Sequence, residues 1–357
     1  MGTARREALA RRHRRLHHVA HRHLPRQDPL GRGGDRMTVA FIGLGNMGGP
    51  MSARLIEAGH RVQGFDVAEP PRRALTEAGG IATTSIPEAI RDADVIILML
   101  PNSDIVEATA EEIMAAVTSN AAPAAIRDAA HASPRDAAEA NAGAIHEAGV
   151  RDRTGAIVVD MSSSEPLRTR ALAAALKARG LTLVDAPVSG GVARARTGKL
   201  TIMTGGDSAD LDRVEPVLSI LGTTTRAGTV GSGHAVKALN NLMSATHLLV
   251  TSEAMLAGER FGLDPEVMLA IFNGSSGRSG STENKWPNFV LPGTFDSGFG
   301  LRLMLKDMRI AVDLAAEVGT PDPLGQAAAD LWSLAATALA PTADHTEIVN
   351  WLRKAPR

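Results

Sequence analysis

A lysine and an asparagine stand four residues apart near the start of a long apolar stretch, and together they could handle a proton. Lys237 and Asn241 lie within residues 231–262. On a helix, residues four apart share a face. Burial lowers the pKa of a lysine toward neutrality, the state that a general acid or base needs. The alternative is a lysine whose ammonium group reaches solvent near the helix start.

The stretch 231–262 predicts one helix of about thirty residues, roughly 45 Å long at about 1.5 Å per residue. Its apolar residues, including Val236, Leu239, Met243 and Val250, occupy several faces. We therefore expect this helix to be buried nearly all round. His234 lies one turn before Lys237 and could tune it, although a surface histidine at a helix start is the simpler expectation.

A glycine-rich turn follows the first strand of the fold. The apolar residues 37–42 predict this strand, and a helix follows the turn. In such a turn the first glycine allows a tight bend, the second lets the backbone approach a pyrophosphate, and the third lets the helix pack on the strand. The turn consists of Gly43, Leu44, Gly45, Asn46, Met47 and Gly48.

The next strand, 61–65, ends in Asp66, whose carboxylate indicates the cofactor. A carboxylate at this position accepts hydrogen bonds from the adenosine ribose hydroxyls and repels a 2′-phosphate. The sequence therefore favours NAD over NADP. Arg72 and Arg73 follow closely and could either hold a 2′-phosphate or cap the next helix.

Composition excludes several classes of protein. The chain of 357 residues has neither cysteine nor tyrosine, which removes disulfides, thiol nucleophiles and a tyrosine proton donor. Residues 1–36 hold ten arginines and five histidines, whereas 37–357 contain 28 basic and 36 acidic residues, a net charge of −8. This mildly acidic body argues against nucleic acid or an anionic membrane as a partner. The scattered histidines favour no metal site.

The length predicts two domains. We expect residues 1–36 to be a disordered extension and Met37 to begin the fold. Residues 37–230 alternate strands and helices and predict a dinucleotide-binding α/β domain of the Rossmann type. Residues 231–357 predict an all-α domain, with the long helix joining the two. The alanine-rich stretch 118–153 is expected to be an exposed insertion.

Small and polar residues follow several predicted strands. The carboxyl ends of parallel strands are where ligands bind in such sheets. Leu100 and Pro101 end one strand, and Ser162 and Ser163 follow another. The turn at 189–191, which comprises Ser189, Gly190 and Gly191, could direct backbone N–H groups at an anion.

From Met37 onward the chain resembles the β-hydroxyacid dehydrogenase family, which includes 3-hydroxyisobutyrate dehydrogenase, tartronate semialdehyde reductase and, more distantly, 6-phosphogluconate dehydrogenase. Four motifs carry the resemblance in the family's order: FIGLGNMGGPM, DAPVSGG followed by GKLTIMTGG, GSGHAVKALNN, and LMLKDM. The insertion 118–153 is longer than the family's usual connection, and Ser163 stands where relatives more often have threonine.

The resemblance implies a role for each matched residue. Lys237 would be the catalytic acid/base, and Asn241 would hold the substrate together with Ser162 and 189–191. Lys306 would approach the nicotinamide end of the site. Leu100, Pro101 and Ser163 would line the cofactor beside the glycine-rich turn and Asp66.

We therefore expect an NAD-dependent oxidoreductase that moves hydride between nicotinamide and a small 3-hydroxy acid or its semialdehyde, resembling 3-hydroxyisobutyrate dehydrogenase. Tartronate or succinic semialdehyde reductase is the alternative within the family. A non-catalytic NAD(P)-binding interaction protein and an imine reductase are the other readings of this fold, but relatives of both kinds lack the lysine. We expect a cytoplasmic homodimer or homotetramer.

Overall fold

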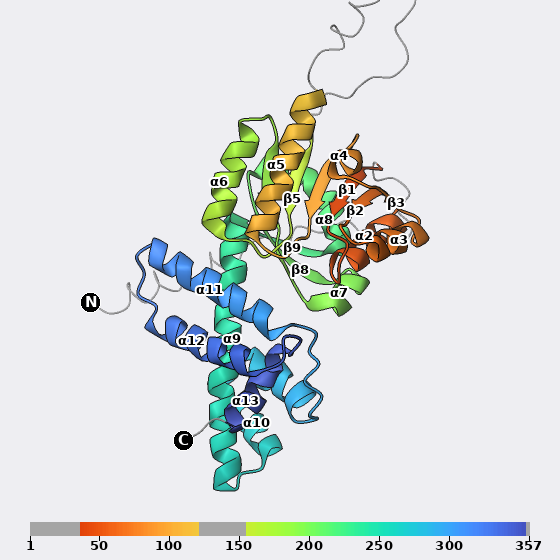
Figure 1. Ribbon diagram of the computed structural model, residues 1–357. Helices are drawn as coiled ribbons and strands as arrows, with labels where there is room; N and C mark the ends of the chain where they lie inside the picture. Colours follow the sequence, from red (N-terminus) through yellow and green to blue (C-terminus); the bar gives the residue numbers. More distant parts are fainter. Residues whose placement is uncertain (1–35, 121–154, 355–357) are drawn as a thin grey trace, which may run out of the picture. The chain divides into compact units, whose positions relative to one another are not determined.

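Figure 1 shows a computed structural model of the protein, which describes residues 36–120 and 155–354. The predicted extension lies outside the described residues except for Arg36. The predicted insertion also lies outside them, apart from residues 118–120 at the end of a helix. No helix in the described ranges is long and apolar enough to cross a membrane.

Nine strands of the described chain form one sheet in the order β3-β2-β1-β4-β5-β6-β8-β7, with β9 paired to β8. The strands from β3 to β6 run parallel, whereas β8 is antiparallel to both β6 and β7. Strand order reverses between β1 and β4, the position at which such sheets open a ligand crevice. The strands are β1 (Thr38–Ile42), β2 (Arg61–Phe65), β3 (Ile81–Ala82), β4 (Val95–Leu98), β5 (Ile157–Asp160), β6 (Thr182–Asp185), β7 (Val188–Ser189), β8 (Leu200–Gly205) and β9 (Gly222–Gly228).

Helices cover both faces of this sheet, and the side-chain alternation of β1 shows why. Val39 and Phe41 join the core under α2 and α8, whereas Ala40 and Ile42 join the core under α5 and α6. A strand buried on both faces reads as a continuous apolar run, as the sequence does here. The helices of this part are α2 (Gly48–Glu57), α3 (Glu69–Glu77), α4 (Ile86–Ala89), α5 (Ser103–Asn120), α6 (Pro166–Lys177), α7 (Gly191–Thr197) and α8 (Ser208–Leu221).

The long helix α9 (Ser232–Phe261) begins against β6, β8 and β9 and continues through a separate helical core. Trp286 and Trp332 are fully buried in that core, and Figure 1 shows the other helices gathered along the lower part of α9. This arrangement confirms the predicted fold class. The remaining helices are α10 (Pro265–Asn273), the π-helical η3 (Ser281–Val290), α11 (Leu301–Glu317), α12 (Pro323–Ala338), the short 3₁₀ helix η4 (His345–Glu347) and α13 (Ile348–Lys354).

The expectation that this helix is buried all round is wrong. Val236, Leu239, Met243 and Val250 are between 43% and 61% exposed. Positions 236, 239, 243 and 250 recur at helical spacing and share one face, which no other described element covers. The apolar residues of the opposite side, such as Leu248 and Met255, are buried as expected.

Candidate active site

The glycine-rich turn between β1 and α2 is shaped to admit a dinucleotide. Gly43 has a φ of +91°, and a Cβ added to it would overlap the carbonyl oxygen of Met99. A Cβ on Gly48 would overlap the carbonyl oxygen of Gly43, which is the close helix-to-strand contact expected of the third glycine. Gly45 faces open space, with no atom within 4 Å of a built Cβ. The turn therefore leaves room for a pyrophosphate and fits a nicotinamide dinucleotide.

Asp66 lies at the end of β2, beside this turn. Its carboxylate accepts hydrogen bonds from the backbone N–H groups of Leu44, at 2.8 Å, and Ala68, at 2.9 Å. Arg72 donates to the carbonyl oxygens of Asp66, at 2.6 Å, and Val67, at 3.2 Å. Arg73 instead forms ion pairs within α3, to Glu69 and Glu77. Of the two arginines, only Arg72 lies at the edge where a ribose would sit.

The ends of β4 and β5 are tied to one another. The backbone N–H of Leu100 donates to Ser162 Oγ at 2.9 Å, and the N–H of Ser162 donates to the carboxylate of Asp160 at 2.9 Å. Ser162 has no exposed surface, which favours a structural link over direct contact with substrate. Ser163 and Pro101 remain partly accessible at the same edge of the sheet.

Lys237 is buried in the second turn of α9, with 6% of its surface exposed. Its Nζ lies 5.9 Å from the centre of the Phe299 ring. Burial lowers the pKa of Lys237; the charge of Asp307 opposes this shift, and the charge of Lys306 adds to it. The alternative of a lysine that reaches solvent is therefore not what the structure shows.

Asn241 shares a buried polar cluster with α11. Its Nδ2 donates to Asp307 Oδ2 at 2.6 Å, and its Oδ1 accepts from the side chain of Asn240 at 3.2 Å. Lys306 forms an ion pair with Asp307 Oδ1 at 3.0 Å and donates to the carbonyl oxygen of Ser163 at 2.6 Å. The structure thus brings together three of the predicted residues, Asn241, Lys306 and Ser163.

His234 is not a surface residue, so that expectation is wrong. It is 1% exposed, with Nδ1 2.9 Å from Thr169 Oγ1 and Nε2 3.1 Å from the carbonyl oxygen of Ser162. The backbone N–H groups of Gly231 and His234 donate to the two carboxylate oxygens of Asp185 at 2.6 and 2.9 Å. Burial raises the pKa of Asp185, and these bonds and His234 oppose the shift. The start of α9 is therefore anchored at the ends of β5 and β6, one turn before Lys237.

The turn at Ser189, Gly190 and Gly191 follows β6 by way of β7. Gly190 has a φ of +127° and Gly191 a φ of +66°, and both values favour glycine. A Cβ on Gly190 would also press into the aliphatic part of Arg194. Within the described ranges, no hydrogen bond or ion pair joins this turn to Lys237, so the structure itself does not assign the two to one site.

Comparisons with known proteins identify the family. Residues 38–152 and 143–236 match the NAD-binding domain of 6-phosphogluconate dehydrogenase, and residues 231–352 match the domain described as NAD-binding of NADP-dependent 3-hydroxyisobutyrate dehydrogenase. A probable 3-hydroxyisobutyrate dehydrogenase of Mycobacterium tuberculosis is 33% identical over 322 residues, which cover 87% of this chain and 94% of that protein. The chain belongs to the β-hydroxyacid dehydrogenase family.

Two further relatives show the range of this family. The 3-sulfolactaldehyde reductase of Escherichia coli is 32% identical over 88% of this chain and 95% of its own length. A solved structure of the M. tuberculosis 3-hydroxyisobutyrate dehydrogenase with L-serine is 30% identical, covers 89% of this chain and 99% of that chain, and superposes with a TM-score of 0.75.

As a β-hydroxyacid dehydrogenase, the protein is an oxidoreductase that binds NAD(P) and acts on the CH–OH group of small hydroxy acids. The expected activity class is confirmed by these relatives, which are dehydrogenases and reductases. The alternative of a non-catalytic interaction protein finds no support among them.

Two residues that contact Asn241 or Lys237 were not predicted from the sequence. Asp307 follows Lys306 directly in the LMLKDM motif, but nothing in its spacing shows that it meets Asn241. Phe299 lies 62 positions after Lys237 and offers no sequence signal of a contact with it. Asp307 reaches the site because α11 packs along α9, and Phe299 lies in the loop just before α11.

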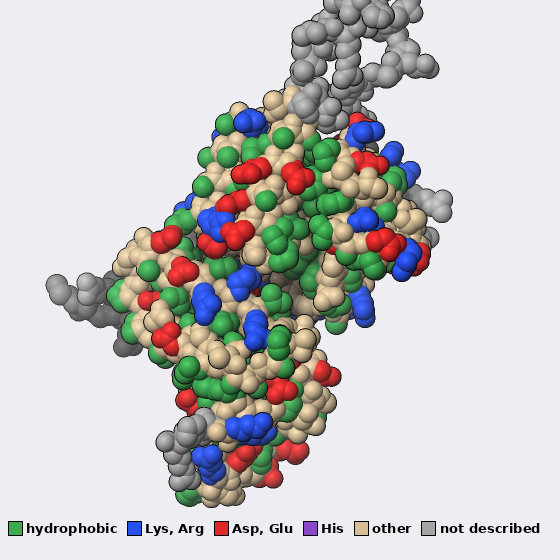
Figure 2. Space-filling view, in the orientation of Figure 1, with side chains coloured by type: hydrophobic (Ala, Val, Ile, Leu, Met, Phe, Trp, Pro, Cys, Tyr) green, Lys and Arg blue, Asp and Glu red, His purple; other side chains and the backbone are tan. Residues whose placement is uncertain are grey.

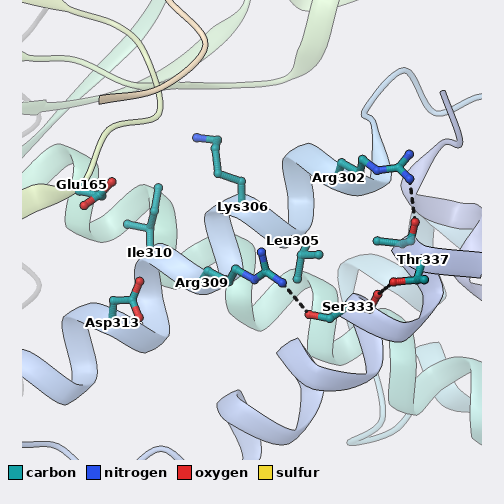
Figure 3. Close-up of a pocket in the computed structure, with 10 residues that line it drawn as sticks. Glu165, Arg302, Leu305, Lys306, Arg309, Ile310, Asp313, Ser333 and Thr337 are labelled. Atoms are coloured by element: carbon teal, nitrogen blue, oxygen red, sulfur yellow. Dashed lines mark hydrogen bonds between the residues drawn. The ribbon is translucent and has the colours of Figure 1, made fainter. Parts of the chain in front are cut away.

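A groove between α11 and α12, also lined by Glu165, shares Lys306 with this site. Figure 3 shows Lys306 extending away from Arg302 and Arg309, whose head groups point toward α12. Arg302 donates to the carbonyl oxygen of Ala336 at 2.8 Å, and Arg309 donates to Ser333 Oγ at 3.1 Å. Because both guanidinium groups are already engaged, we do not assign the substrate to this groove. Its lining is Glu165, Arg302, Leu305, Lys306, Arg309, Ile310, Asp313, Ser333, Ala336 and Thr337.

Proposed function

We propose that Lys237 is the general acid/base of a dehydrogenase acting on a small 3-hydroxy acid and its semialdehyde, resembling 3-hydroxyisobutyrate. The observation that carries this proposal is a buried lysine with a lowered pKa, set in a polar cluster with Asn241, Asp307 and Lys306. A nicotinamide cofactor, when bound, accepts or supplies the hydride at its C4 carbon.

In the oxidative direction, neutral Lys237 takes the proton of the substrate hydroxyl while the carbinol carbon loses hydride and becomes a carbonyl. In the reductive direction, the ammonium form returns that proton to the oxygen. A lysine with its ordinary pKa would be almost fully protonated near neutral pH, so the lowered pKa supports this role.

Asn241 is suited to orient the same substrate oxygen. Asp307 accepts one Nδ2 hydrogen of Asn241, and Asn240 donates to its Oδ1 atom. These two bonds hold the plane of the Asn241 amide in place. The second Nδ2 hydrogen is then available to the substrate. Lys306, fixed between Asp307 and Ser163, adds charge at the nicotinamide side of the cluster.

The substrate carboxylate is proposed to lie at the turn of Ser189, Gly190 and Gly191. Esterifying the acid of the best substrate, chosen from a panel of 3-hydroxy acids and semialdehydes, should lower kcat/KM by about ten- to a hundredfold. A hydrogen bond to a charged group contributes about 1.5–3 kcal/mol, and the ester loses that charge. Steady-state kinetics on the acid and its methyl ester provide the measurement. Similar kcat/KM values for both would contradict the proposed pose.

We propose NAD as the preferred cofactor, because the Asp66 carboxylate lies at the edge where a 2′-phosphate would approach. NAD should give a several-fold or larger kcat/KM than NADP, and Asp66→Ser should reduce this preference by removing the repulsion. Arg73→Ala is the matched control, since the ion pairs of Arg73 to other described residues all lie within α3. Equal efficiency with both cofactors in the parent protein would point instead to Arg72 as a phosphate ligand.

We propose residues 37–230 and 231–357 as the two domains, supported by the separate apolar cores of the sheet and of the α9 helices. The exposed apolar face of α9 supports a homodimer or homotetramer. Figure 2 shows acidic and basic side chains intermixed on the face drawn, which supports a small molecule rather than nucleic acid or a membrane as the partner. We also propose a cytoplasmic location for the enzyme.

A further inference from the structure

The carboxylate of Asp344, near the end of the described chain, gathers hydrogen bonds from a distant loop. Ser297 Oγ lies 2.8 and 2.9 Å from its two oxygens, and the N–H groups of Gly298 and Phe299 donate to Oδ2 at 2.9 and 3.2 Å. Thr346 donates to Oδ1 from both its backbone, at 2.9 Å, and its hydroxyl, at 2.7 Å. One carboxylate thus fixes the backbone of the loop before α11.

His345 holds the same loop through contacts of its own. Its backbone N–H donates to the carbonyl oxygen of Phe299 at 2.8 Å, and its Nδ1 lies 3.1 Å from that oxygen and 2.9 Å from Ser297 Oγ. The rings of His345 and Phe299 meet edge to face, with centres 5.9 Å apart and planes at 77°. The N–H, the carbonyl and the ring of Phe299 are therefore all held by residues 344 and 345.

The ring of Phe299 in turn lies under the ammonium group of Lys237, 5.9 Å from Nζ to the ring centre. We propose that Asp344 is a positioning residue for the reaction: it holds Phe299 against Lys237 and thereby stabilises the charged form of that lysine. An aromatic face within about 6 Å attracts a cation, more strongly when the pair is desolvated. This inference rests on the proposed role of Lys237.

Asp344 and His345 keep their ionisation states near and above neutral pH. Burial alone would raise the pKa of Asp344, but hydrogen bonds from His345 and Thr346 outweigh it and hold the pKa well below its usual range. Burial lowers the pKa of His345, so its ring is neutral near pH 7. The charged groups that act on Lys237 itself are Asp307 and Lys306.

Lys285, whose charge acts on Asp344 and His345, would itself titrate within the assay range. Its Nζ donates to Ser244 Oγ at 2.8 Å, and burial lowers its pKa to about 8 against the opposing charge of Asp344. A Lys285→Met variant should therefore be profiled beside the others, so that the ionisation of Lys285 is not mistaken for that of Lys237.

The test is a double-mutant cycle between Asp344→Asn and Phe299→Leu, with kcat measured against pH in the oxidative direction. Each single variant should lower the plateau value of kcat by about three- to thirtyfold, because the ammonium ion formed during oxidation loses its cation–π contact. The same loss should move the rising limb of the profile to lower pH. In the Phe299→Leu background, Asp344→Asn should change kcat by less than about twofold. Asp330→Asn is the matched control, because Asp330 is exposed and, among the described residues, accepts a hydrogen bond from Gln326 alone.

A purely structural role would give a different pattern. Asp344→Asn would then lower Tm without moving the rising limb of the kcat profile, or would lower kcat by the same factor in the parent protein and in Phe299→Leu. Either result overturns the proposal. If Asp344→Asn does not fold, Ser297→Ala removes a single hydroxyl from the cluster and should show the same coupling to Phe299→Leu with a smaller change in kcat.

A measurement without turnover separates this proposal from the proposed function. Competitive labelling of Lys237 by acetic anhydride at a series of pH values, read by mass spectrometry, reports the pKa of Lys237 directly. Asp344→Asn and Phe299→Leu should both lower that pKa. If the pKa from labelling falls while the rising limb of kcat stays in place, Lys237 is not the acid/base although Asp344 positions Phe299. If the pKa from labelling does not change, Asp344 does not act through Phe299.

Discussion

Lys237→Ala is expected to lower kcat by about 10²- to 10⁴-fold, the usual contribution of a positioned general acid or base. The affinity for NAD should stay nearly unchanged, because the proposed pyrophosphate site lies at the glycine-rich turn of residues 43–48, on the first strand of the sheet. Steady-state kinetics and fluorescence titration of the cofactor measure the two quantities. Lys177→Ala, at an exposed position of α6, is the control for losing a lysine elsewhere.

Lys237→Arg separates proton transfer from charge. A guanidinium group keeps the positive charge but does not release a proton near neutral pH, so this variant should be about as impaired as the alanine variant. An active arginine variant would leave Lys237 as an electrostatic support and move the search for the acid/base to Lys306. A change in Tm with little change in kcat would show instead that Lys237 has only a structural role.

The first half of the fold follows closely from local signals. The strand at 61–65 was predicted with its observed bounds, and the glycines of the turn at 43–48 have the close contacts that the motif requires. These features could be predicted because the strand, the turn and the helix are neighbours in sequence. Their geometry depends on backbone constraints that each residue type carries by itself.

The C-terminal part was harder to predict because its contacts span long stretches of chain. The π-helical η3 contains Pro287, and η4 and α13 are short; none of these was expected. Phe299 and Asp344 show no periodicity that marks them, yet they meet through hydrogen bonds between segments 45 residues apart. Composition indicated a helical domain but could not show that the loop carrying Phe299 packs against Lys237.

The apolar residues of α9 illustrate a different limit. Hydrophobic side chains on all sides of a helix predict full burial. Sequence pattern cannot tell whether the covering surface belongs to the same chain or to another copy. Met243 is 61% exposed and Val250 is 55% exposed, although both match the pattern of the buried Leu248. The pattern therefore predicted correctly that this face of the helix is apolar, but it predicted wrongly that other described residues of the chain bury it.

Asp307 is expected to set the pH range in which the enzyme works. It is 2% exposed, and its charge raises the pKa of Lys237 against the larger lowering by burial. Asp307→Asn keeps the size of the side chain and an oxygen that can accept from Asn241, but removes the charge. The pKa of Lys237 should then fall further.

The sign of the effect differs between the two directions of the reaction. Oxidation needs neutral Lys237, so its rising limb in kcat should move to lower pH in Asp307→Asn. Reduction needs the ammonium form, so its falling limb should move the same way and activity near pH 7 should decrease. Profiles of kcat in both directions measure this, with Asp313→Asn, an exposed aspartate on the same helix, as the control.

Asp307→Leu removes the charge and, in addition, the hydrogen bond to Asn241 at 2.6 Å and the ion pair to Lys306 at 3.0 Å. Because a misplacement of about 1 Å at a reacting group can cost about 10²-fold, kcat should fall by roughly that factor in both directions. The asparagine variant thus reports the charge of Asp307, and the leucine variant reports its hydrogen bonding. If the pH profiles of kcat do not move in Asp307→Asn, Asp307 orients Asn241 without changing the pKa of Lys237.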